Sequence, residues 1–138
     1  MQQSLEIFQQ AKRHDLAAKY ISELSEVLRL LQAWEELQSL AETALKMHLN
    51  CGTQMQVAED YGFLAEVALQ RSQWEKACKL AKSALSILET AETSKKETGL
   101  YLLLLAKAQR NLSQQLEAVR NLETAKEILS LKMKYNFI

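Results

Sequence analysis

The feature that most constrains the fold of this chain is an internal repeat of about forty residues. When the chain is compared with itself at offsets of 40 and then 41 residues, positions of the same chemical type align. The aligned sets include Leu24, Leu64 and Leu105; Ala44, Ala84 and Ala125; and Trp34 with Trp74, where Gln115 is the odd member. A repeat unit of this length cannot bury its apolar face alone and must stack on its neighbours. The repeat therefore predicts an array of stacked units.

Within each unit the apolar residues recur at the spacing of an α-helix. One such stripe comprises Ala77, Leu80, Ala81, Ala84, Leu85 and Leu88. The turn inside each predicted helix pair falls at aligned positions, Gln32, Ser72 and Ser113. The pattern predicts an all-α fold of about seven helices in successive antiparallel pairs. Their expected ranges are 4–13, 15–31, 33–50, 54–70, 73–91, 95–112 and 114–134.

Composition supports this expectation because the chain contains no proline and only three glycines. Tight turns in sheet proteins depend on these residues, which supply a fixed or a positive φ. A sandwich, a barrel or a glycine-rich nucleotide-binding fold is therefore not expected. Capping boxes predict helix starts at Ser72–Glu75 and Ser94–Glu97, and Gly52 is expected to end a helix in the left-handed conformation.

Charge and cysteine content narrow the function class. The 17 basic and 17 acidic side chains cancel, which argues against a nucleic-acid or membrane-surface protein driven by electrostatics. No apolar run reaches the ~18 residues of a membrane span, and no signal peptide is visible. The two cysteines, Cys51 and Cys78, are too few for a disulfide framework. These observations predict a cytoplasmic protein.

The middle unit carries a motif that can be compared with a known repeat. A large residue, a leucine and a small residue in its first helix precede an aromatic and two alanines in its second. These residues are Tyr61, Leu64, Ala65, Trp74, Ala77 and Ala84. The pattern resembles the tetratricopeptide repeat (TPR) family, in a degenerate form whose period exceeds the family's ~34 residues and which lacks the family's closing proline.

The resemblance implies a single TPR-like array over residues 1–138, folded as a right-handed α-solenoid of antiparallel helix pairs. Its repeats would be 18–51, 58–91 and 99–132, and residues 4–13 would be the second helix of a partial preceding repeat. Members of the family bind an extended peptide or a partner helix in a concave groove lined by first helices. The residues implied to line the groove are Lys19, Ser22, Glu26, Arg29, Glu59, Gly62, Glu66, Gln70, Leu103, Lys107, Arg110 and Asn111.

The charges of this implied groove are uneven. Glu26, Glu59 and Glu66 would lie toward one end, and Lys107 with Arg110 toward the other, which suggests a partner of mixed or dipolar charge. Ordinary solvation of a charged surface is an equally good interpretation. The carboxylate clamp of the chaperone-binding subgroup is not expected, because its residue types are missing at the matching positions.

Candidate chemistry is weak elsewhere in the chain. His48 and Cys51 have the spacing of metal ligands, but no second pair exists, so an ordinary helix end is the favoured interpretation. Tyr20, Tyr61 and Tyr101 recur at similar spacing and form either an aromatic ladder or, as we favour, part of the core. The isolated glycines form no phosphate loop, and no ordered catalytic triad is present. We therefore expect no enzyme activity, no metal and no cofactor.

The sequence thus predicts a non-catalytic protein-protein interaction module, a domain of a larger scaffold or signalling protein. Its partner would be another protein, as a peptide or helix, or a neighbouring domain. Two alternatives stay open. One is a structural segment that self-associates into a homo-oligomer through its end helices. The other is a small secretion chaperone of the TPR type.

Overall fold

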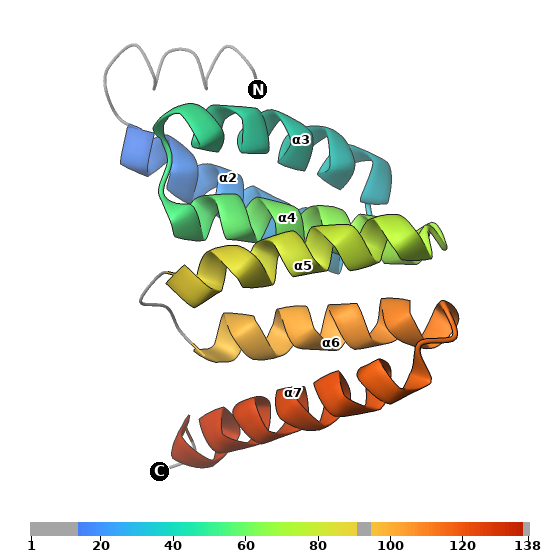
Figure 1. Cartoon of the computed structure of the whole chain (residues 1–138). Coiled ribbons are helices and arrows are strands. Elements are labelled where there is room, and N and C mark those ends of the chain that lie inside the picture. Colours follow the sequence, from blue (N-terminus) through green and yellow to red (C-terminus); the bar gives the residue numbers. More distant parts are fainter. Residues whose placement is uncertain (1–13, 91–94, 137–138) are drawn as a thin grey trace.

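The computed structural model describes residues 14–90 and 95–136, and these residues form six helices without a strand (Figure 1). The helices are α2 (His14–Leu30), α3 (Trp34–Cys51), α4 (Gln54–Gln70), α5 (Trp74–Thr90), α6 (Lys95–Asn111) and α7 (Gln115–Asn136). The all-α prediction is confirmed for this part of the chain. The predicted helix at 4–13 lies outside the described residues.

The helix starts follow the forty-residue frame. Helices α3, α5 and α7 begin at residues 34, 74 and 115. Their starts are therefore separated by 40 and 41 residues, the offsets at which the sequence aligns with itself. The two tryptophans and the odd member Gln115 are the first residues of α3, α5 and α7.

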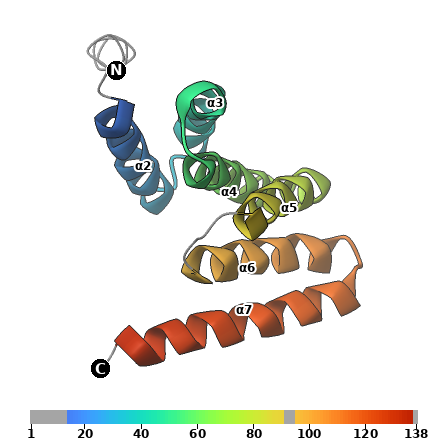
Figure 2. The same cartoon turned by 60° about the vertical axis from the view of Figure 1, so that its left-hand side comes forward.

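The helices pack in chain order, each against the next, and in both views α4, α5, α6 and α7 follow one another (Figures 1 and 2). Helix α4 also contacts α2 and α6. Among the described residues, by contrast, α3 does not contact α5 and α5 does not contact α7. The first helices of successive pairs therefore lie closer together than the second helices.

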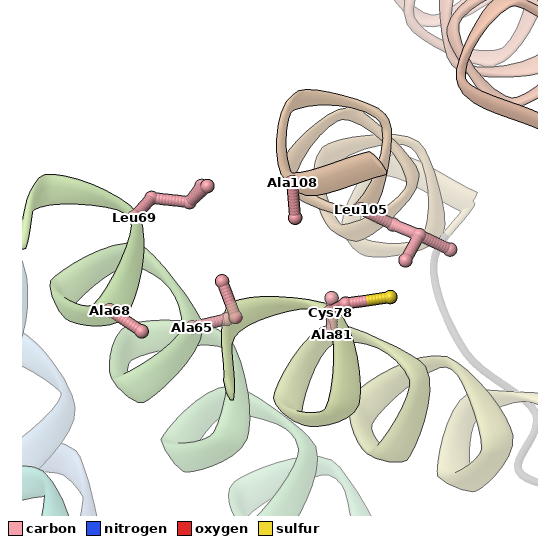
Figure 3. Close-up of a cluster of buried hydrophobic side chains, with 8 residues drawn as sticks. Ala65, Ala68, Leu69, Cys78, Ala81, Leu105 and Ala108 are labelled. Carbon is pink, nitrogen blue, oxygen red and sulfur yellow. The ribbon is translucent and has the colours of Figure 1, made fainter. Parts of the chain in front are cut away.

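Small residues allow this close packing. The main core cluster joins three helices through Ala65 and Ala68 of α4, Ala81 of α5, and Leu105 and Ala108 of α6. Figure 3 shows Cys78 and Ala81 pointing from α5 toward the side chains of α6. Alanine at these buried positions keeps helix axes near each other, and the leucines fill the space beside them.

The turns inside the helix pairs share one backbone device. Gln32, Ser72 and Ser113 are the non-glycine residues with positive φ among those described, at 59°, 58° and 64°. Each follows a helix, and the next residue donates its amide back to a carbonyl of the last helical turn. These bonds are Ala33 N to Leu28 O (2.9 Å), Gln73 N to Ala68 O (2.8 Å) and Gln114 N to Gln109 O (2.9 Å). This is the Schellman pattern, in which the left-handed position usually holds glycine.

Two capping predictions are wrong. Ser72 was expected to cap the start of α5, but its left-handed backbone closes the end of α4 instead, and α5 begins two residues later. Gly52 is extended, with φ −97° and ψ 178°, so it is not the left-handed terminator that was expected. The capping box that starts α4 belongs to Thr53 and Gln56. The box predicted at Ser94 lies outside the described residues.

No helix within the described ranges is both long enough and apolar enough to cross a bilayer.

Candidate functional site

The residues implied to line a groove lie on the three first helices. Ser22, Glu26 and Arg29 are on α2; Glu59, Glu66 and Gln70 are on α4; and Leu103, Lys107, Arg110 and Asn111 are on α6. Lys19 also belongs to α2, but its side chain lies outside the described part of the chain. We call this set, without Lys19, the first-helix face.

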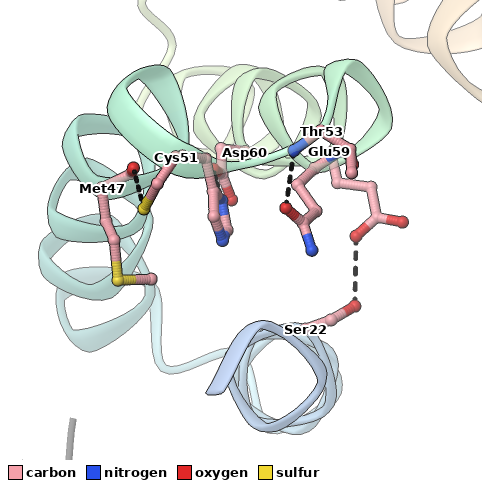
Figure 4. A network of polar contacts seen from close by, with 8 residues as sticks. Ser22, Met47, Cys51, Thr53, Glu59 and Asp60 are labelled. Carbon is pink, nitrogen blue, oxygen red and sulfur yellow. Dashed lines mark hydrogen bonds and ion pairs between the residues drawn. The ribbon is translucent and has the colours of Figure 1, made fainter. Parts of the chain in front are cut away.

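Helices α2 and α4 are joined across this face near their amino-terminal halves. The hydroxyl of Ser22 donates to Glu59 Oε2 at 3.1 Å (Figure 4). Glu59 is half-buried, and burial raises the pKa of its carboxyl. The Ser22 hydrogen bond acts in the opposite direction, and the neighbouring carboxylates of Asp60 and Glu97 raise the pKa further.

A second link follows toward the other end of α2 and α4. Arg29 Nη1 lies 3.8 Å from Glu66 Oε1, and Arg29 also pairs with Glu26 on its own helix. Burial raises the pKa of Glu66, whereas the charges of Arg29 and Lys107 lower it. Glu66 therefore interacts with cations on both neighbouring first helices. The charge of Glu66 is therefore partly compensated within the face.

Within the described residues, no hydrogen bond or salt bridge links the remaining members of the first-helix face to another helix. Gln70, Lys107, Arg110 and Asn111 are exposed, and Leu103 is half-buried. Asn111 Nδ2 donates to the Lys107 carbonyl of its own helix at 2.9 Å. These side chains are therefore accessible to a partner.

Gly62 does not line an open surface as the resemblance implied. It is buried, and a Cβ atom at this position would lie 2.5 Å from Cε1 of Tyr101. The ring of Tyr101 thus closes over α4, and glycine is required for this contact between α4 and α6. Burial raises the pKa of the Tyr101 phenol, and the carboxylates of Glu59, Glu97 and Asp60 raise it further.

The three tyrosines do not form a uniform ladder. Tyr101 is buried and Tyr61 is half-buried, and both belong to the cluster that joins α4, α5 and α6. Tyr20, in contrast, is 57% exposed. The core interpretation is correct for Tyr61 and Tyr101 and wrong for Tyr20.

A buried polar pair behind the first-helix face was missed by the sequence analysis. His48 Nδ1 of α3 lies 2.5 Å from Asp60 Oδ2 of α4, and both side chains are only 5% exposed. Burial raises the pKa of Asp60, and the hydrogen bond with His48 counteracts that rise. The other ring nitrogen, Nε2, is buried and has no hydrogen-bond partner among the described residues.

The repeat frame contained a signal for this pair. His48 aligns with Leu88, and Asp60 aligns with Tyr101. Leu88 and Tyr101 are buried in one cluster between α5 and α6. Two polar residues at positions that are apolar in the next unit therefore indicated a buried polar contact. Treating His48 as part of an ordinary helix end was wrong.

The contacts do not assemble a metal site from His48 and Cys51. Cys51 is exposed, and its Sγ donates to the Met47 carbonyl at 3.3 Å, whereas His48 faces Asp60. Among the described residues, no group of three or more His, Cys, Asp and Glu side chains is placed to hold a metal ion. What the first-helix face offers is charge, hydrogen-bonding groups and exposed side chains along three helices.

No protein-family model matches this chain, and the comparison with curated proteins finds no match.

Proposed function

We propose that this chain is a TPR-like, right-handed solenoid that binds an extended peptide or a partner helix along the first-helix face. It acts without catalysis, as a cytoplasmic domain of a larger scaffold or signalling protein. The observation that carries the proposal is the asymmetry of packing among the described residues: α2, α4 and α6 contact one another in series, whereas α3, α5 and α7 do not. A curved array with its first helices on the inner side would have this asymmetry.

The chemistry of the face supports binding of a polar, extended partner. Its side chains already bridge neighbouring helices through Ser22–Glu59 and Arg29–Glu66. Lys107 and Arg110 on α6 are exposed and have no ion pair with a described residue. A partner that brings carboxylates to α6 and hydrogen-bonding groups to α4 fits this distribution.

Charge reversal tests the proposal. Proteins captured from a lysate by the wild-type chain are compared, by quantitative mass spectrometry, with those captured by Lys107→Glu and by Glu66→Lys. We expect one partner whose capture falls at least about tenfold with both variants, because Lys107→Glu would face the partner's carboxylates and Glu66→Lys would remove the pairing with Arg29 that links α2 and α4. The control is Lys82→Glu, an exposed change on α5 outside the face.

A partner captured equally by all four proteins would contradict the proposal. The second candidate, self-association through the end helices, is favoured by exposed apolar side chains on α2 and α7. These are Val27 and Leu30 of α2, and Leu116 and Val119 of α7. Sedimentation velocity over a range of protein concentrations distinguishes it, because self-association would increase with concentration and would be insensitive to Lys107→Glu. A secretion chaperone would instead stabilise one labile client on co-expression.

A further inference from the structure

A pocket of about 530 Å³ lies where α5 begins and α6 ends. It is lined by Gln73, Trp74, Glu75, Lys76, Lys79 and Leu112. None of these residues belongs to the first-helix face. The pocket is therefore a separate surface feature.

The floor of the pocket is apolar and continuous with the core. Trp74 and Leu112 are half-buried and pack against the main core cluster of α4, α5 and α6. A large apolar side chain placed here would extend that core and would bury part of the Trp74 ring. Tryptophan at the rim of a pocket is a typical anchor of a protein interface.

The repeat frame provides an internal comparison. The junction between α3 and α4, which we call the first junction, aligns with the junction between α5 and α6, the second junction. In the first junction Trp34 aligns with Trp74, and Arg71 stands at the position of Leu112. Arg71 Nη1 donates to Gln38 Oε1, which ties the end of α4 to α3. In the second junction Cys78 replaces the glutamine, and neither it nor leucine can form this side-chain bridge.

The rim of the pocket has an excess of positive charge. Lys76 and Lys79 are exposed, and neither forms an ion pair with any described residue. At the aligned positions of the first junction stand Glu36 and Ser39. The lysines also lie in the first turns of α5, where the helix dipole favours anions.

We propose that this pocket docks an acidic segment of a partner protein that inserts one aromatic or large aliphatic side chain against Trp74. The carboxylates of the segment would lie beside Lys76 and Lys79. A peptide is favoured over a nucleic acid because the floor is apolar, one carboxylate lines the pocket, and the chain as a whole has no net charge. The surface would bind independently of the first-helix face.

The experiment uses the fluorescence of Trp74. In a Trp34→Phe background Trp74 is the only tryptophan, because the chain has two. The probe is a synthetic peptide with one phenylalanine flanked by aspartates and glutamates. We expect a saturable fluorescence change, and affinity at least about tenfold weaker for Lys76→Glu/Lys79→Glu. Both lysines are exposed, so the double variant should keep its helical circular dichroism.

A second variant tests the pocket itself. Cys78→Gln/Leu112→Arg recreates the bridge of the first junction and should abolish the fluorescence response. Lys82→Glu, on the same helix but outside the pocket, should leave the affinity within about twofold of wild type. The proposal is overturned if the lysine variant binds as tightly as wild type, or if a peptide with alanine in place of phenylalanine binds equally well. A single-stranded oligonucleotide that binds more tightly than the peptide, through the same lysines, would also overturn it.

Discussion

At the scale of single residues, the turns inside the helix pairs reverse the chain without glycine. Gln32, Ser72 and Ser113 adopt a left-handed backbone, which costs an L-residue with a side chain roughly 1–2 kcal/mol relative to the right-handed region. The cost is tolerated because each turn gains backbone hydrogen bonds that satisfy the preceding helix end. The turns therefore have the usual Schellman geometry, although residues other than glycine occupy their left-handed positions.

We expect Ser72→Gly to raise the free energy of unfolding by about 0.5–1 kcal/mol. Glycine removes the strain of the left-handed position, and its greater freedom in the unfolded chain cancels part of the gain. Urea denaturation would measure the change. The matched control is Ser86→Gly, an exposed position inside α5, which should lower stability by about 0.5–1 kcal/mol. Equal destabilisation by both variants would contradict the assignment of strain to Ser72.

At the scale of elements, the junction between α3 and α4 differs in chemistry from the junction between α5 and α6. The first uses His48 and Asp60, and the second uses Leu88 and Tyr101 at aligned positions. Tyr101 fits because Gly62 leaves room for its ring on α4. At the first junction the residue aligned with Gly62 is Ser22, which binds Glu59.

A comparison of one single and one double variant tests the energetic role of the buried pair. His48→Leu alone should destabilise the protein by about 3 kcal/mol, because Asp60 would remain buried without its partner. The double variant His48→Leu/Asp60→Leu should come within about 1 kcal/mol of wild type, since apolar residues replace both polar groups. Urea denaturation at neutral pH gives both values. If the double variant were as unstable as the single one, the pair would not be the source of the loss.

At the scale of the whole molecule, three acidic groups share one electrostatic property. Burial raises the pKa of Glu59, Asp60 and Glu66 above their ordinary values of 4.5, 3.8 and 4.5. The folded state then holds protons that the unfolded state has already released. Stability contributed by these groups is fully present below the ordinary values and is lost as the pH rises through the raised ones.

We therefore expect a lower free energy of unfolding at about pH 7 than at about pH 5. Glu59→Gln/Glu66→Gln should reduce this difference and should be more stable than wild type at the higher pH, because amides carry no charge to desolvate. Urea midpoints at both pH values provide the measurement, with Glu42→Gln, an exposed residue of α3, as the control. If the free energy of unfolding changed between the two pH values by the same amount in the wild type and the double variant, this explanation would be contradicted.

The sequence predicted the helices well because their signal is local and repeated. Apolar spacing and the two offsets located the starts of α3, α4, α5 and α7 to within one residue, and the turn positions Gln32, Ser72 and Ser113 were identified from alignment alone. What could not be predicted is the conformation that the backbone adopts at those positions. Serine serves both as a helix start and, less often, as a left-handed helix end, so the role of Ser72 was misassigned.

Contacts between helices were harder to predict than the helices themselves. The repeat predicts which residues belong to the first-helix face. The hydrogen bonds and ion pairs between these residues depend on distances between helices, which the sequence of one helix does not determine. Glu66 lies between Arg29 and Lys107 only because α4 packs between α2 and α6. The closure of Tyr101 over Gly62 likewise depends on tertiary packing.

The polar junction at His48 and Asp60 also has a consequence for the fidelity of assembly. If α4 docked on α5 in the place of α6, Asp60 would meet Leu88, and its buried carboxylate would have no donor. Such an uncompensated charge costs several kcal/mol, comparable to a large share of a small domain's stability. Two otherwise similar helix pairs are thereby prevented from exchanging places, and the order of the repeats is encoded by chemistry as well as by chain connectivity.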